Sequence, residues 1–148
     1  MALTLPPDFK EFLKLLQEND VEYLLIGGYA VGYYGYPRAT QDLDIWISVT
    51  PENASKLIET LQAFGFPTTD IQVDLFQQDN NIIRMGIPPM RIELLKEISG
   101  VEFESCYKQR IVDKIDGQQV NLISLKQLKK NKEASGRYKD LDDLENLP

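Results

Sequence analysis

Residues 26–47 read IGGYAVGYYGYPRATQDLDIWI, and they are the most informative stretch of this 148-residue chain. Side chains alternate between the two faces of a β-strand, so a strand over about 43–49 places Asp42 and Asp44 on the same face. The opposite face would be apolar and would carry Leu43, Ile45, Ile47 and Val49. The pattern therefore predicts two neighbouring carboxylates on one side of a strand whose other side lies in the core.

The Asp-x-Asp pair has two interpretations. Two ionised carboxylates this close repel each other, and a divalent cation would relieve the repulsion. Mg²⁺ in particular binds through one or two carboxylates together with substrate phosphates. The alternative is a solvent-facing strand with ordinary polar residues, although aspartate is disfavoured in strands. Because the pair alone is a weak signal, other parts of the sequence are needed to distinguish a metal site from a solvent-facing strand.

Gly27 and Gly28 follow a short apolar strand, Tyr23–Ile26, and precede a helix predicted to extend to about Tyr34. Glycine lets the backbone approach a ligand closely, and the free amides at the start of a helix favour phosphate. A plain strand-to-helix turn is the competing interpretation. A dinucleotide-binding fold fits less well, because the chain has no Gly-x-Gly-x-x-Gly and carries an acidic pair in place of one ribose-binding carboxylate.

A third carboxylate, Glu93, lies between apolar residues in a strand predicted over 91–95. If that strand lies beside the Asp-x-Asp strand, the three carboxylates can hold two Mg²⁺ ions, one for a triphosphate and one for the attacking oxygen. Phosphoryl chemistry depends mainly on positioning and charge neutralisation, so it needs no histidine. The alternative is an edge-strand charge paired with Arg91, which lies on the same face.

Composition excludes several kinds of site. The chain has no histidine, which rules out His-based zinc sites, Ser-His-Asp triads and a Cys-His nucleophile at Cys106, the only cysteine. A net charge of −7 argues against broad coating by nucleic acid. Six of the 16 basic residues lie within 126–139. They could form either a solvated helix face or a local binding segment. With no long apolar run and no recognisable signal peptide, we expect a cytoplasmic protein with no membrane partner.

The predicted elements form an α/β or α+β domain, with a mixed sheet and packed helices. We expect a single domain over residues 1–148, with a core over about 1–123 and C-terminal helices over about 124–148. An Asp-x-x-Glu signal at Asp8 and Glu11 predicts the start of the first helix. Residues 66–80 stay ambiguous. The expected helices cover 8–19, 27–34, 50–64, 124–136 and 139–146, and the expected strands cover 23–26, 43–49, 82–87, 91–95, 110–115 and 118–122.

Three segments in this order resemble the nucleotidyltransferase signature of the polymerase-β superfamily. The finer match is to minimal nucleotidyltransferases and to the AbiEii-type toxins of toxin–antitoxin systems. The first segment is residues 26–47, including Arg38 and Thr40; the second is MRIELLKEISGVEF, residues 90–103; the third is LKKNKEASGRYKDLDDLENL, residues 128–147. The resemblance covers most of the chain and implies the polymerase-β-type nucleotidyltransferase fold.

Carried over by position, the resemblance implies a site. Asp42, Asp44 and Glu93 would be catalytic and would bind Mg²⁺, with two ions during turnover and Mn²⁺ as a substitute, and Glu93 would act as base on the acceptor hydroxyl. The implied nucleotide-binding residues are Gly27, Gly28, Arg38, Thr40, Lys132, Arg137 and Asp140. The glycines would cradle the triphosphate, Lys132 would reach a phosphate, and Arg137 and Asp140 would shape the same wall.

The predicted activity is Mg²⁺-dependent transfer of a nucleoside monophosphate from an NTP to a hydroxyl of RNA, such as a tRNA end, or of a protein. The resemblance implies a toxin-like role opposed by a cognate antitoxin. Related proteins usually have aspartate at the position of Glu93. This difference favours an alternative, a catalytically weak module that binds a nucleotide or a partner without turnover. A sugar-nucleotide transferase would also use Asp-x-Asp, but it would leave the glycine pair unexplained.

Overall fold

The structure, a computed structural model, describes residues 3–37, 40–66, 82–87 and 90–148. Its elements in chain order are α1 (Pro7–Glu18), β1 (Tyr23–Ile26), α2 (Gly27–Tyr33), β2 (Asp42–Ile47), α3 (Pro51–Phe64), β3 (Ile82–Ile87), β4 (Met90–Leu95), α5 (Phe103–Lys108), β5 (Ile111–Ile115), β6 (Gln118–Leu122), α6 (Leu125–Ser135) and α7 (Tyr138–Asn146). Most of the ambiguous segment, 67–80, lies outside the described residues, as does Arg38. Within the described ranges, no helix is both long enough and apolar enough to cross a membrane.

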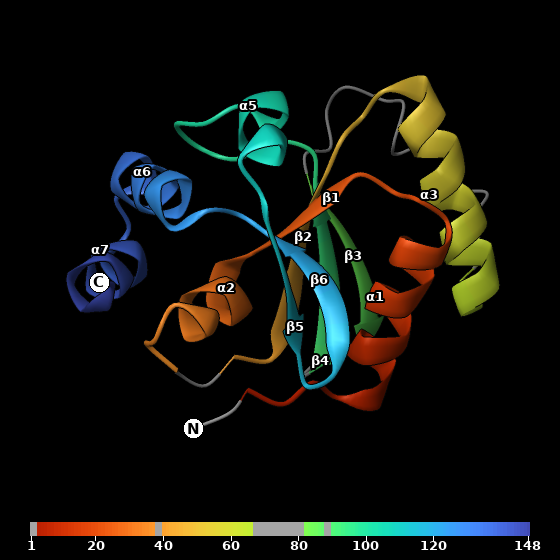
Figure 1. Ribbon diagram of the computed structural model, residues 1–148, viewed down its shortest axis with the longest axis horizontal. Helices are drawn as coiled ribbons and strands as arrows, with labels where there is room; N and C mark the ends of the chain where they lie inside the picture. Colours follow the sequence, from red (N-terminus) through yellow and green to blue (C-terminus); the bar gives the residue numbers. More distant parts are fainter. Residues whose placement is uncertain (1–2, 38–39, 67–81, 88–89) are drawn as a thin grey trace.

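The six strands form one mixed sheet in the order β3-β4-β2-β1-β6-β5. β2 is antiparallel to β1 and parallel to β4, and the pairs β3-β4 and β5-β6 are antiparallel. Helices α1 and α3 lie along one side of the sheet, while α5, α6 and α7 lie on the other (Figure 1). The prediction of a mixed sheet with packed helices is confirmed. The order also places the Asp-x-Asp strand between the strand that precedes the glycine pair and the strand that carries Glu93.

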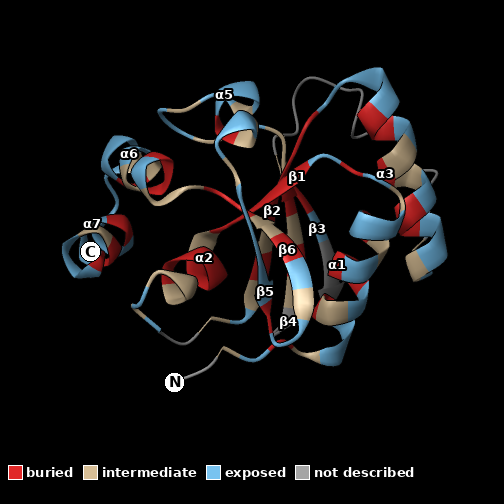
Figure 2. Ribbon diagram, viewed as in Figure 1, coloured by how far each residue is buried: buried red, intermediate tan, exposed pale blue. Residues whose placement is uncertain are grey.

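The core between the sheet and helices α1 and α3 follows from the alternation in β2. Leu43, Ile45 and Ile47 are completely buried, as predicted. Burial of each such side chain contributes about 1.5–3 kcal/mol. The prediction is wrong for Val49, which is 49% exposed because β2 ends at Ile47 and the chain turns toward α3 (Figure 2).

Side-chain caps fix two of the helix starts. The Thr50 hydroxyl accepts a hydrogen bond from the Asn53 amide, and Ser124 caps α6 in the same way. The capping signal predicted at Asp8 is wrong. α1 begins at Pro7, whose fixed φ suits the first helical position, so Asp8 falls inside the first turn, with no side-chain cap.

Helix α5, which the sequence pattern did not indicate, covers part of the carboxylate side of the sheet. Its Phe103 ring packs edge-on against Trp46, with the ring centroids 5.1 Å apart. Trp46 follows Asp42 and Asp44 on the same face of β2 and is almost completely buried. This face is therefore apolar under α5 and polar only at the end where the aspartates lie. Cys106 of α5 is also buried, and burial raises the pKa of its thiol to about 11, which fits a packing role.

Candidate active site

Neighbouring strands bring the carboxylates together. The parallel register of β2 and β4 pairs Asp44 directly with Glu93, and the antiparallel register of β1 and β2 pairs Asp44 with Ile26, the residue before the glycine pair. Asp42 lies two residues before Asp44 and therefore on the same face. The Glu93 strand therefore lies beside the Asp-x-Asp strand, which is the condition that a three-carboxylate site requires.

Asp44 is the electrostatic centre of this group. Burial raises the pKa of its carboxyl to about 7, helped by the charge of Glu93, by a hydrogen bond between the two carboxyl groups and by the charge of Asp42. The charge of Lys139 acts in the opposite direction. The protonated form of Asp44 is therefore favoured well above the usual pH range of a carboxyl group, first by burial and then by the neighbouring carboxylates.

Two arginines act as counter-ions of the outer carboxylates. Arg84 of β3 lies across the hairpin from Glu93, and its Nε is 3.1 Å from Glu93 Oε1. Arg91 lies opposite Asp42 in the parallel register, and its Nε is 3.4 Å from Asp42 Oδ1. The alternative in which Glu93 pairs with Arg91 is therefore wrong, because the register gives Arg91 to Asp42 and leaves Glu93 to the edge strand.

The donor set suits a hard divalent cation, although the side chains are not arranged around one. Within the described part of the chain, no three cysteine, aspartate or glutamate side chains form a group that could hold a metal ion. In this arrangement the Asp42 and Glu93 carboxylates are engaged by Arg91 and Arg84. The oxygens of Asp42, Asp44 and Glu93 are nevertheless the ligand type that Mg²⁺ prefers. Burial raises the pKa of Asp44 most, and the charges of Glu93 and Asp42, which a cation would offset, raise it further.

The two glycines have different neighbours. Gly27 has a φ of +68°, and a Cβ atom at this position would collide with Asp44 Oδ2, so the backbone turn lies directly against the carboxylate. A Cβ at Gly28 would lie 2.8 Å from Thr40 Oγ1. The Thr40 hydroxyl in turn donates to the Asp42 carbonyl oxygen at 3.3 Å. Gly27 therefore borders the carboxylates, whereas Gly28 is buried against the segment that leads into β2.

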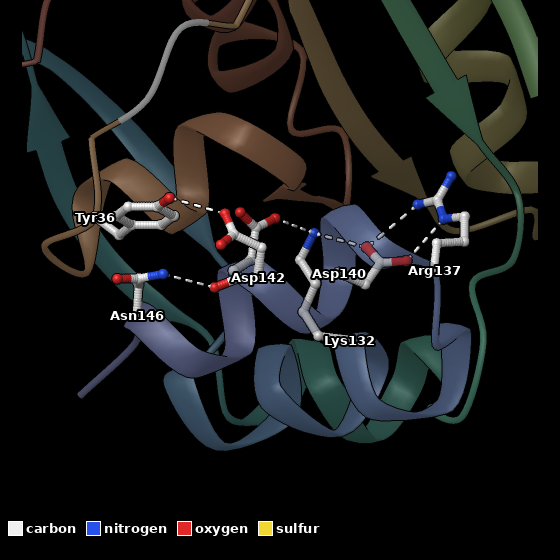
Figure 3. Close-up of polar contacts among 7 residues, drawn as sticks. Tyr36, Lys132, Arg137, Asp140, Asp142 and Asn146 are labelled. Atoms are coloured by element: carbon white, nitrogen blue, oxygen red, sulfur yellow. Dashed lines mark hydrogen bonds and ion pairs between the residues drawn. The ribbon is translucent and has the colours of Figure 1, made fainter.

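A buried ion cluster joins α6 to α7 (Figure 3). The Lys132 ammonium lies 3.1 Å from Asp140 Oδ1 and 3.0 Å from Asp143 Oδ2, and all three side chains are at most 5% exposed. Arg137 adds a second cation, with Nε 2.7 Å from Asp140 Oδ2. Burial alone would raise the pKa of Asp140, but hydrogen bonds from Arg137, Ser135 and Lys132 hold it well below its usual range. The cluster fixes the two helices against each other.

These features border one cleft of about 480 Å³ between the sheet and the C-terminal helices. The predicted residues that line it are Gly27, Asp42, Asp44, Glu93, Lys132 and Arg137. Gly28, Thr40 and Asp140 contact this lining from behind. Arg84 and Lys139 also line the cleft, and neither was among the predicted site residues. Lys139 belongs to the basic segment within 126–139, which was a signal in the sequence, whereas nothing local in the sequence distinguishes Arg84.

Solved structures with the same fold are nucleotidyltransferases. A candidate nucleotidyltransferase from Thermotoga maritima (TM1012) has a TM-score of 0.64 and 16% identity, over 96% of this chain and 93% of that chain. The antibiotic-resistance factor ANT(2'')-Ia has a TM-score of 0.58 and 12% identity, over 93% and 79%. The lincosamide antibiotic adenylyltransferase LnuA, in its lincomycin-bound form, has a TM-score of 0.56 and 15% identity, over 97% and 96%. The predicted polymerase-β-type nucleotidyltransferase fold is confirmed.

The sequence itself identifies the family. A comparison with curated protein sequences gives no match. A family model described as aminoglycoside-2''-adenylyltransferase matches residues 8–147, which is nearly the whole chain. These findings support a nucleotidyltransferase without pointing to the AbiEii-type toxins in particular. The chain therefore belongs to the aminoglycoside-2''-adenylyltransferase family, whose members are nucleotidyltransferases.

Proposed function

We propose that the cleft transfers a nucleoside monophosphate from an NTP to a hydroxyl group of an acceptor. The observation that carries the proposal is the direct pairing of Asp44 with Glu93, two residues along the strand from Asp42 and beside the Gly27 turn. Three carboxylates next to a close backbone turn match the needs of phosphoryl chemistry, which depends on positioning and on neutralising phosphate charge.

A divalent cation, Mg²⁺ or Mn²⁺, would be held by Asp42, Asp44 and Glu93. When bound, it would neutralise phosphate charge and lower the energy of the charged transition state. The counter-ions Arg84 and Arg91 would have to leave the outer carboxylates first. These pairs are partly exposed to solvent, which limits the stability that each of them contributes.

The reaction itself is a substitution at the α-phosphorus of the NTP. The acceptor oxygen forms a bond to that phosphorus, the bond to pyrophosphate breaks, and pyrophosphate leaves with the electron pair. We propose Glu93 as the group that receives the hydroxyl proton, because it lines the cleft directly beside Asp44. The Gly27 turn would lie along the triphosphate, and the wall formed by Lys132, Arg137 and Asp140 would face it from the other side of the cleft.

The preferred acceptor class is a small hydroxylated molecule that carries positive charge. The matching family is named for adenylyl transfer to aminoglycosides, which is the first support for this choice. The second is electrostatic, since a chain with net charge −7 attracts a cation and repels polyanionic RNA. The second candidate is RNA or protein, in a toxin with a cognate antitoxin, and it rests on the three sequence segments that resemble AbiEii-type toxins. Glu93 in place of aspartate supports the alternative of nucleotide binding without turnover.

Radiolabelled NTPs distinguish these possibilities. The protein with Mg²⁺ and an α-labelled NTP is offered an aminoglycoside, lincomycin, total RNA or cell protein, and Asp44→Asn is the control. We expect label on a small molecule, and no label with the variant or with excess chelator. Label on RNA or protein would support the second candidate, and NTP binding without transfer would support the non-enzymatic alternative. Equal labelling by Asp44→Asn would show that the proposed site is wrong.

A further inference from the structure

The cationic side chains that line the cleft differ in how far they are already committed. Among the described residues these are Arg84, Lys132, Arg137 and Lys139. Arg84 is paired with Glu93, and Arg137 binds Asp140 through both Nε and an NH₂ group. A side chain that holds a buried or bidentate partner cannot turn to a substrate without leaving that partner unsatisfied.

Lys132 is the most committed of the four. Its side chain is 5% exposed, and its ammonium lies about 3 Å from carboxylate oxygens of both Asp140 and Asp143. If the ammonium moved toward a phosphate, the buried carboxylates of Asp140 and Asp143 would both lose their ion pair with it. Lys132 therefore serves to hold α7 against α6.

Lys139 has the opposite character. It is exposed, lines the cleft, and forms no ion pair within 4 Å with any residue that the structure describes. Its charge nevertheless acts on Asp44 across the cleft. It is the second residue of α7, where a cation opposes the helix dipole, so the helix gains nothing from it. A ligand therefore explains a lysine at this position better than the stability of the fold does.

We infer that Lys139 is the residue of the C-terminal wall that binds a phosphate oxygen of the NTP, and that Lys132 acts indirectly by fixing α7 so that Lys139 lies opposite the carboxylates. This inference rests on the proposed function, since it requires a nucleotide in the cleft. It assigns the phosphate contact to the uncommitted lysine in place of the one that the sequence motif indicated.

Calorimetric titration tests the assignment. The unchanged protein, Lys139→Met, Lys139→Arg and the matched control Lys126→Met are titrated with each of the four NTPs in Mg²⁺, and their unfolding is followed without ligand. Lys126 is an exposed lysine of the same basic segment that does not line the cleft. A charged hydrogen bond predicts roughly ten- to hundredfold weaker binding of the preferred NTP by Lys139→Met. Lys139→Arg should retain most of the affinity, and all variants should unfold at nearly the same temperature.

Each outcome has a separate meaning. NTP affinity of Lys139→Met within twofold of the unchanged protein would overturn the assignment while leaving the proposed function intact. An equal loss in Lys126→Met would also overturn it, since the effect would then be one of net charge. If the unchanged protein binds no NTP, the proposed function fails and the assignment fails with it.

Discussion

Replacement of Asp44 by asparagine should stabilise the metal-free protein at neutral and alkaline pH. The folded-state pKa of Asp44 is about 7, against an ordinary value of 3.8. Below about pH 3 the carboxyl is protonated in both the folded and the unfolded chain, so it costs no stability. As the pH rises toward 7, the unfolded chain gives up the proton while the folded chain still holds it, and the free energy of unfolding falls. Above pH 7 the loss is complete.

The magnitude follows from the two pKa values. Each pKa unit corresponds to about 1.4 kcal/mol, so a difference of about 3 corresponds to about 4 kcal/mol. Asp44 is only partly buried by surface area and shares its charge with Glu93, which reduces the effect to about 2–4 kcal/mol. Asparagine has the same shape, carries no charge, and can still donate a hydrogen bond to Glu93. We therefore expect a gain of that size for Asp44→Asn at pH 8 and almost none at pH 3.

Urea unfolding in chelator, at a series of pH values, measures this difference. The single tryptophan, Trp46, is buried beneath α5 and reports unfolding by fluorescence. Glu133→Gln is the matched control, because it removes an exposed carboxylate of α6 that does not line the cleft. A stability difference between Asp44→Asn and the unchanged protein that does not vary with pH, or a loss of stability at pH 8, would refute the electrostatic account of the site.

Three further substitutions test other parts of the structure. Lys132→Met should destabilise the fold by about 3–5 kcal/mol, because two buried carboxylates lose an ion pair, and a drop in melting temperature no larger than that of Lys126→Met would contradict this. Gly27→Ala should abolish transfer and cost about 1–3 kcal/mol, because its Cβ displaces the Asp44 carboxylate, and full activity would show that this contact is unimportant. Arg84→Gln should bind Mn²⁺ up to about fivefold more tightly in the absence of nucleotide, measured by electron paramagnetic resonance, since its ion pair competes with the metal; unchanged affinity would exclude that competition.

Strand periodicity was sufficient to predict the carboxylate face of β2 and the existence of the strand that carries Glu93, but not that the two strands are neighbours. The alternation in β2 placed Asp42 and Asp44 opposite Leu43 and Ile45 because the two faces of a strand meet different surroundings. The hairpin at Asp116-Gly117 was also recognisable, because Asp-Gly is a favoured pair where both turn residues need a positive φ. Both residues do have a positive φ in the structure.

The features that local pattern could not predict depend on register and on tertiary packing. Arg84 becomes the partner of Glu93 only through the pairing of β3 with β4, which one strand's sequence does not reveal. Helix α5 has only six residues, so apolar positions cannot recur often enough in it to reveal a helical pattern. Its position is set by the contact of Phe103 with Trp46. The double ion pair of Lys132 likewise depends on Asp143, which lies one helical turn after Asp140 in α7. The residues next to Lys132 in the sequence do not indicate it.

The ammonium that α6 shares with two carboxylates of α7 also constrains how the molecule can move. The two helices can separate only if the buried ion pairs of Lys132 with Asp140 and Asp143 break, so we expect α6 and α7 to move together. The connection from β6 to α6 is itself anchored, because Ile123 is completely buried and its amide donates a hydrogen bond to the Leu25 carbonyl oxygen. The two helices are therefore tied to the central strand β1 as well as to each other.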